Sequence, residues 1–168
     1  ALSGYLVSAL RRGEFAVLTS ALDTIVTTDP HPAHFLPLFI SIGDAAWARG
    51  EFEKAAGLYQ RLQSADISEG LTESAIVRSA ALNNNAVRPG LQRYFLADVP
   101  DSVRAKLLDS LLQTLPGNSI FLYLRGKILH RMERFEESLA VLDTLDMSTI
   151  DRRLNATRLK MIGTSLFR

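Results

Sequence analysis

Cysteine is absent from this chain of 168 residues. Its absence excludes disulfide bonds, thiolate metal sites and cysteine nucleophiles, and it is compatible with either the cytoplasm or an oxidising compartment. A concentrated positive charge is also missing, because the formal net charge is only +1. Binding to nucleic acid or to an anionic membrane needs such a concentration. We therefore expect no nucleic-acid partner.

Long apolar runs are missing as well. A membrane-spanning helix needs about 18 predominantly apolar residues in succession, and the best candidate, FLPLFISIGDAAWA, is interrupted by Asp44. No signal peptide is visible. We expect no membrane span in this segment, and the sequence leaves the compartment undecided.

Motifs of catalysis and cofactor binding do not occur either. The sequence has no glycine-rich phosphate loop, no serine elbow and no HExxH motif. His31 and His34 have a spacing that occurs in metal sites, but zinc needs a third and a fourth ligand, and no cysteine can supply one. We interpret both histidines as loop residues between helical hairpins. The sequence thus predicts no enzymatic activity, no cofactor and no metal site.

What the chain does contain is an internal repeat. The segment GEFAVLTSALDTIVTTDP begins at Gly13, GEFEKAAGLYQRLQSADI begins at Gly50, and an imperfect copy, ERFEESLAVLDTLDMSTI, begins at Glu133. A repeat of this length indicates a stack of helical hairpins, because each hairpin is too small to bury its apolar face alone. The hydrophobic content of 47% is ample for a packed interior. We predict an all-α fold.

The copy around Gly50 shows the hairpin most clearly. Apolar and small residues recur at steps of three and four on both sides of this glycine, which places them on one stripe of each of two helices. Gly50 suits the left-handed backbone position just past the end of a helix. Helices about 8–10 Å apart need a small side chain where they cross, so we expect Gly43 to face the small positions of the second helix. The stripe residues are Phe39, Ile42, Gly43, Ala46 and Trp47 before the turn, and Phe52, Ala55, Ala56, Tyr59 and Leu62 after it.

These positions resemble the tetratricopeptide repeat (TPR), which has a small residue at the eighth place, glycine at the fifteenth, an aromatic residue at the seventeenth and alanine at the twentieth. The first copy departs from this pattern with Leu6 and Leu18 at the two small places. The third departs with Glu133 in place of the glycine and Ser138 in place of the alanine. The resemblance implies a right-handed superhelix of antiparallel helix hairpins, a TPR-like α-solenoid. The residues that match best are Gly43, Gly50, Phe52, Ala55 and Tyr59.

We predict a single array of about four hairpins followed by a C-terminal helix. In the third hairpin, which is divergent, Pro89 and Gly90 interrupt any long helix, so we expect an extra short helix around residues 91–97. The C-terminal helix has the pattern of a first helix, with Leu159, Ile162, Gly163 and Leu166 on its stripe. We interpret the chain as a fragment of a longer array and not as one that ends in a capping helix. The predicted ranges are 2–29, 35–66, 70–115 and 118–146 for the hairpins, and 150–167 for the final helix.

The resemblance also implies a concave binding groove lined by the first helices. Aromatic residues and arginines dominate interface energetics, so Trp47 and Tyr123 are the leading anchor candidates, although core packing explains Trp47 equally well. A solvated helix face is one interpretation of the group of Lys127, His130 and Arg131. If the group lines the groove, it makes the C-terminal half of the groove positive, which favours an acidic peptide or a carboxylate. The residues placed in the groove are Val7, Leu10, Arg11, Ile40, Asp44, Trp47, Ala48, Tyr123, Lys127, His130, Arg131, Lys160, Thr164 and Phe167.

Three functions follow from this organisation, and the sequence leaves them open. The leading hypothesis is a protein–protein interaction scaffold that binds a peptide or protein partner in the groove. The second is a structural spacer or self-associating segment, and thus a possible homo-oligomer, in a larger secretion, envelope or other multidomain protein. A ligand-binding or catalytic helical domain is the weakest, because it requires a closed pocket with convergent polar groups.

Overall fold

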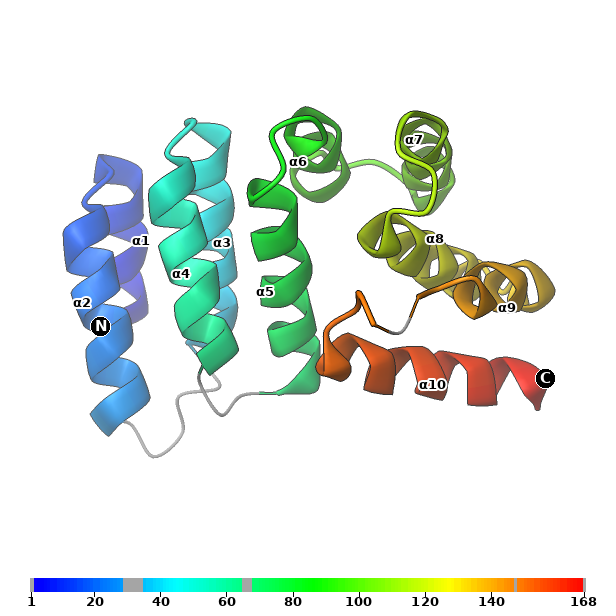
Figure 1. The fold of residues 1–168 in the computed structure, drawn as a ribbon. Helices are drawn as coiled ribbons and strands as arrows, with labels where there is room; N and C mark the ends of the chain where they lie inside the picture. Colours follow the sequence, from blue (N-terminus) through cyan, green and yellow to red (C-terminus); the bar gives the residue numbers. More distant parts are fainter. Residues whose placement is uncertain (1, 29–34, 65–67, 147, 168) are drawn as a thin grey trace. The chain divides into compact units, whose positions relative to one another are not determined.

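The structure is a computed structural model that describes residues 2–28, 35–64, 68–146 and 148–167. The described residues form ten α-helices and no strand (Figure 1), which confirms the predicted all-α class. They divide into two compact units, unit 1 (Ala1–Asn83) and unit 2 (Asn84–Arg168). The helices of unit 1 are α1 (Leu2–Arg12), α2 (Phe15–Thr28), α3 (Leu36–Ala48), α4 (Phe52–Ser64) and α5 (Glu69–Leu82). Those of unit 2 are α6 (Arg88–Leu96), α7 (Asp101–Thr114), α8 (Ser119–Arg131), α9 (Phe135–Asp143) and α10 (Arg152–Leu166).

Unit 1 is built from two helix pairs and one further helix. Helix α1 packs against α2, α3 packs against α4, and α5 packs against both α4 and α3. The apolar stripes predicted around Gly50 meet in the interior, where they remove their side chains from water. The largest fully buried side chains of this unit are Leu6, Leu18, Leu22, Leu36, Phe39, Ile42, Trp47, Tyr59 and Leu62.

The three repeat copies turn in the same way. Gly13, Gly50 and Glu133 each have a positive φ, at 73°, 79° and 59°. In each turn the amide after this residue donates to a carbonyl five residues earlier, which is the bond that closes a helix with a left-handed last residue. These bonds run from Glu14 to Ala9 (3.0 Å), from Glu51 to Ala46 (2.9 Å) and from Arg134 to Leu129 (2.9 Å). The imperfect third copy therefore keeps the turn even though it lacks the glycine.

The contact between paired helices differs from the prediction for Gly43. A Cβ at position 43 would lie 2.4 Å from Cε1 of Tyr59, so this glycine faces the largest side chain of the α4 stripe and not a small one. Gly126 faces Leu142 in the same way, at 2.4 Å from its Cδ2, and both partners lie sixteen residues after their glycine. The expectation of small facing small was wrong, because a glycine leaves room for a bulky residue opposite it.

Ser138, the other departure in the third copy, is fully buried between α8 and α9. Its hydroxyl donates to the carbonyl oxygen of Gly126 at 2.9 Å. A buried hydroxyl needs such a partner, so the serine fits the alanine place and adds a bond between the two helices.

The expected short helix is present in unit 2 as α6, but it begins earlier than residue 91. Pro89 occupies its first turn, where the missing N–H has no helical partner to lose. Gly90 lies against Leu111 of α7, since a Cβ there would be 2.6 Å from Cδ2 of the leucine. Helix α6 ends with its last carbonyls bonded to Arg104 of α7, whose guanidinium donates to the oxygens of Tyr94 (3.2 Å) and Ala97 (3.3 Å).

In the rest of unit 2, α8 and α9 form a helix pair, and α7 and α10 pack against it. Helix α8 packs against α7 and pairs with α9, and α10 packs against both α9 and α8. Asp151 caps α10 by accepting from the backbone N–H of Arg153 at 2.8 Å. The predicted third hairpin, residues 70–115, crosses the boundary between the units, because α5 belongs to unit 1 and α6 and α7 belong to unit 2.

Candidate partner-binding surface

The two leading anchor candidates are interior residues. Trp47 and Tyr123 are both 0% exposed, and Ile40 is only 9% exposed. The reason is the position of their helices: α3 lies against α4 and α5, while α8 lies against α7, α9 and α10. A first helix surrounded in this way turns its large apolar side chains into the unit. Trp47, Tyr123 and Ile40 are therefore core residues, and the assignment of the first two as partner anchors is corrected.

Asp44, also assigned to the groove, joins three helices of unit 1. Its Oδ1 accepts the hydroxyl of Tyr59 from α4 at 2.6 Å. Arg78 of α5 donates to the same carboxylate through Nε at 2.8 Å and through Nη2 at 3.1 Å. Burial raises the pKa of the Tyr59 hydroxyl well above its ordinary value, and the charge of Asp44 adds to this effect. The Asp44 carboxylate thus holds α3, α4 and α5 together.

Arg78 is a residue that the sequence analysis missed. Its guanidinium also donates to Oγ of Ser74 at 2.6 Å, one turn earlier on α5. The signal was a single cation inside the otherwise uncharged stretch AIVRSAAL. An arginine in an apolar stretch is rarely buried unless a carboxylate pairs with its guanidinium group.

His130 is half-buried at the end of α8 in unit 2. Its ring lies edge-on to Phe135, with the ring centroids 5.3 Å apart. The ring nitrogen Nε2 is buried and has no hydrogen-bond partner among the described residues. This places His130 against the first residue of α9 as a packing residue.

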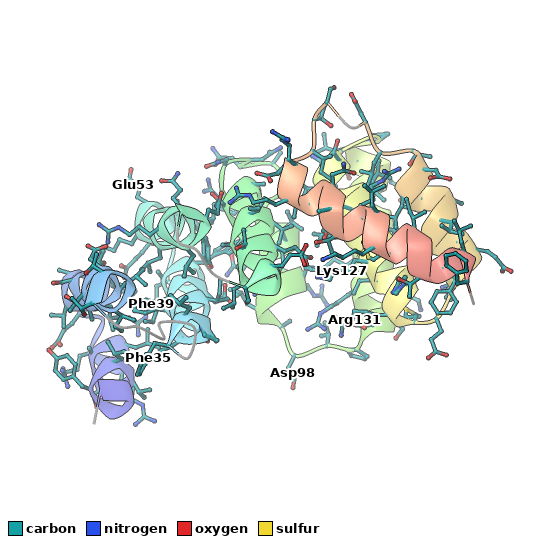
Figure 2. The ribbon with its side chains drawn as sticks, turned by 90° about the horizontal axis from the view of Figure 1, so that it is seen from below. Phe35, Phe39, Glu53, Asp98, Lys127 and Arg131 are labelled. Atoms are coloured by element: carbon teal, nitrogen blue, oxygen red, sulfur yellow. The ribbon has the colours of Figure 1, made fainter. Side chains whose placement is uncertain are left out.

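Lys127 and Arg131 remain at the surface and define what we call the basic edge of α8. They are one helical turn apart, and Figure 2 shows both side chains on the same side of the helix. Arg131 is 56% exposed, and its Nη2 lies 3.0 Å from Oδ2 of Asp101 in the first turn of α7. Asp101 also meets Nη1 of Arg104 at 3.2 Å. One carboxylate thus lies between two guanidinium groups beside the basic edge.

The other groove residues at the surface belong to α1, α3 and α10. Val7, Arg11 and Ala48 are exposed in unit 1, and Leu10 is half-buried there. In unit 2, the exposed ones besides Arg131 are Lys160, Thr164 and Phe167. Among the charged residues predicted for the site, Arg11, Arg131 and Lys160 are exposed, and Lys127 and Asp44 are half-buried.

An apolar cleft that the sequence analysis did not predict lies between α1 and α2 in unit 1. It has a volume of about 570 Å³. Small side chains at a spacing of four on α2 (Ala16, Ser20 and Thr24) leave this space open. The other lining residues are Tyr5, Val17, Ala21 and Ile25. The polar side-chain groups in its lining are the hydroxyls of Tyr5, Ser20 and Thr24.

No group of three or more histidine, cysteine, aspartate or glutamate side chains lies together in residues 2–28, 35–64, 68–146 and 148–167. His31 and His34 lie outside these ranges. Within the same part of the chain, no helix has both the length and the apolar character needed to cross a bilayer.

No protein-family model, curated protein or solved structure matches the chain. The resemblance to the TPR pattern therefore depends on the residues of the three copies and on the turns and helix contacts that they form.

Proposed function

We propose that the chain is a protein–protein interaction scaffold of the TPR type, which binds an acidic segment of a partner protein along its first helices. The observation that carries the proposal is the positive charge of the groove residues at the surface. Arg11, Arg131 and Lys160 are exposed and Lys127 is half-buried. The acidic groove residue, Asp44, is also half-buried and is bonded to Tyr59 and Arg78. Cationic side chains at a surface select acidic partners through electrostatic complementarity.

Helical hairpin repeats suit this function because successive hairpins present first-helix side chains at regular intervals. The repeated turn and the repeated sixteen-residue contact support an array of this kind in the present chain. We propose that it is not an enzyme. The little-exposed carboxylate–guanidinium pair of Asp44 with Arg78 serves helix packing, and the cleft of unit 1 is lined by apolar groups and hydroxyls.

The test measures binding of fluorescein-labelled acidic peptides by fluorescence anisotropy, with versions in which lysine replaces every glutamate as the probe control. The variant combines Lys127→Glu with Arg131→Gln. The control is Lys106→Glu, which makes the charge change of Lys127→Glu at an exposed position of α7. We expect the variant to weaken binding by roughly tenfold or more and the control to change it by less than about twofold.

Two results would contradict the proposal. One is equal affinity for the acidic and the lysine-substituted peptides. The other is unchanged affinity of the Lys127→Glu, Arg131→Gln variant, after its circular dichroism spectrum shows that it is folded. A further expectation is that binding weakens as salt is raised, since surface charge pairs are screened.

A further inference from the structure

Helix α10 has two different apolar faces. One face packs on α8 and α9 and carries Leu154, Met161 and the aliphatic part of Arg158. The other face lies about a third of a turn away and has residues at positions i, i+3, i+4 and i+7, the pattern of one side of a helix. Its members Leu159 and Leu166 are 55% and 68% exposed. Isolated exposed leucines are ordinary, but two on one stripe with Ile162 and Gly163 form a continuous face.

The same face is covered in α3. Aligned on their glycines, the stripe of α10 (Leu159, Ile162, Gly163 and Leu166) corresponds to Phe39, Ile42, Gly43 and Ala46. All four residues of α3 are buried, and the space above Gly43 is filled by Tyr59 of α4. In α8, Leu142 of α9 fills the space above Gly126. A Cβ added at Gly163 would meet nothing within 4 Å. The position that a bulky side chain fills in two helix pairs is therefore open in α10.

The chain itself shows which kind of helix covers such a face. Helices α4 and α9 both begin with phenylalanine, carry a small residue three positions later and place a bulky residue seven positions later. These residues are Phe52, Ala55 and Tyr59 in α4, and Phe135, Ser138 and Leu142 in α9. In each pair the bulky residue lies on the glycine of the first helix. The complementary element for α10 is a helix with this spacing.

The charge of α10 indicates the charge of the complementary helix. Helix α10 contains four basic residues and no acidic one within its fifteen residues. Arg152 and Lys160 are exposed on it. Helix α9, which covers the equivalent face of α8, contains three acidic residues and no basic one. An acidic helix is favoured on α10 by the same complementarity.

We propose that the face formed by Leu159, Ile162, Gly163 and Leu166 docks an acidic amphipathic helix of a partner protein. The partner helix carries an aromatic residue, a small residue and a bulky residue at the spacing of α9, and its bulky side chain lies on Gly163. This surface is distinct from the basic edge of α8. It therefore adds an apolar contact to the contact that an acidic segment makes with the basic edge.

The probe for the test is a fluorescein-labelled peptide with the sequence of residues 133–146, ERFEESLAVLDTLD, added to the full chain. Gly163→Phe fills the open position and is expected to weaken binding by roughly tenfold or more. Gly57→Phe makes the same substitution in α4, where a Cβ meets nothing within 4 Å, and is expected to change the affinity by less than about twofold. A second variant, Leu159→Ser with Leu166→Ser, replaces only exposed side chains, so it folds even if Gly163→Phe does not. It is expected to weaken binding to a similar extent.

Three results would overturn the assignment. One is the absence of saturable binding of the peptide. The second is binding that Gly163→Phe and the double serine variant leave unchanged, which would mean that the peptide replaces α9 on α8. The third is a dimer of the chain alone that both variants dissociate in sedimentation, which would make a second copy the occupant. The measurement is repeated in the Lys127→Glu, Arg131→Gln background, where the basic edge no longer attracts an acidic probe. Gly163→Phe is expected to weaken the binding that remains there, so failure of this inference and failure of the proposed function are distinguishable.

Discussion

The ring of Tyr59 lies over Gly43, where a side chain on residue 43 would need to be. Its Cε1 and Cζ would be 2.4 and 2.8 Å from a Cβ at that position. The hydroxyl of the same ring reaches Asp44, the next residue of α3, at 2.6 Å. The glycine thus permits both the close packing of α3 on α4 and the hydrogen bond that the tyrosine makes with the carboxylate.

Replacing this glycine by alanine tests the contact. Gly43→Ala forces the Tyr59 ring to move, and we expect a loss of about 1–3 kcal/mol in the free energy of unfolding from overpacking. The matched control is Gly57→Ala in α4, where a Cβ meets nothing within 4 Å. That change should raise the free energy of unfolding by about 0.5–1 kcal/mol, since alanine is the better helix former. Urea unfolding of both variants measures the difference, and equal effects at the two glycines would refute the contact.

Removal of the Asp44 carboxylate tests its role in packing. Asp44→Ala leaves Arg78, whose side chain is only 12% exposed, without its carboxylate. We expect a loss of about 3 kcal/mol in the free energy of unfolding. Tyr59→Phe removes one hydroxyl and should cost about 1 kcal/mol. Asp23→Ala, which breaks the exposed pair with Arg61 (3.4 Å), should cost less than about 1 kcal/mol. Similar losses for Asp44→Ala and Asp23→Ala in thermal unfolding would show that Asp44 does not tie the helices.

The third turn offers a stabilising substitution. Glu133 has a φ of 59°, a value that costs a residue with a side chain more than it costs glycine. We expect Glu133→Gly to raise the free energy of unfolding by about 1 kcal/mol. Glu136→Gly, in the first turn of α9, should instead lower it by about 1 kcal/mol. Chemical denaturation distinguishes the two signs, and a destabilising Glu133→Gly would contradict the turn geometry.

Asp151 makes the stability of unit 2 depend on pH in the acidic range. The hydrogen bonds from the Arg153 side chain, at 3.1 and 3.0 Å, and from its backbone N–H lower the pKa of Asp151 below its ordinary value. Because the folded-state pKa is the lower one, the stabilisation is complete above the unfolded-state pKa of about 3.9. It is lost as the pH falls toward the folded-state pKa.

Two substitutions at residue 151 separate the cap from the charge. Asp151→Ala should cost about 1 kcal/mol at neutral pH, through loss of the cap of α10. Asp151→Asn keeps a capping oxygen and should flatten the acid limb of a plot of stability against pH. An unchanged acid limb in the asparagine variant would mean that the Asp151 carboxylate makes no such contribution.

The sequence was sufficient for the helices and the turns because their signals are local. The 3.6-residue stripes around Gly50 predicted α3 and α4, and the left-handed position predicted for Gly50 is present. Glu133 shows that the repeat register is more informative than the residue at one position, since it adopts the same conformation without being glycine. The start of α6 was placed too late because Pro89 was interpreted as a break, whereas the first turn of a helix accommodates proline.

The surface could not be predicted in the same way, because exposure depends on how many neighbours a helix has. Trp47 and Tyr123 belong to helices that pack against two or more other helices, and both side chains are buried. The periodicity of a sequence does not show how many helices pack around a given helix. Asp44 and Arg78 are 34 residues apart, so no local pattern joins them. Gly163 matched a pattern in the sequence, but only the structure shows that its position is open, unlike those of Gly43 and Gly126.

A double-mutant cycle at Gly126 and Leu142 tests the central claim most directly, namely that the pairs α3–α4 and α8–α9 are each closed by a bulky side chain lying on a glycine sixteen residues earlier. Gly126→Ala alone is expected to destabilise unit 2, and Leu142→Ala alone should cost about 2–5 kcal/mol. In the Leu142→Ala background the added methyl group has room, so Gly126→Ala should become neutral or stabilising. We predict a coupling energy of at least about 1 kcal/mol. Additivity of the two substitutions to within about 0.5 kcal/mol would contradict the account.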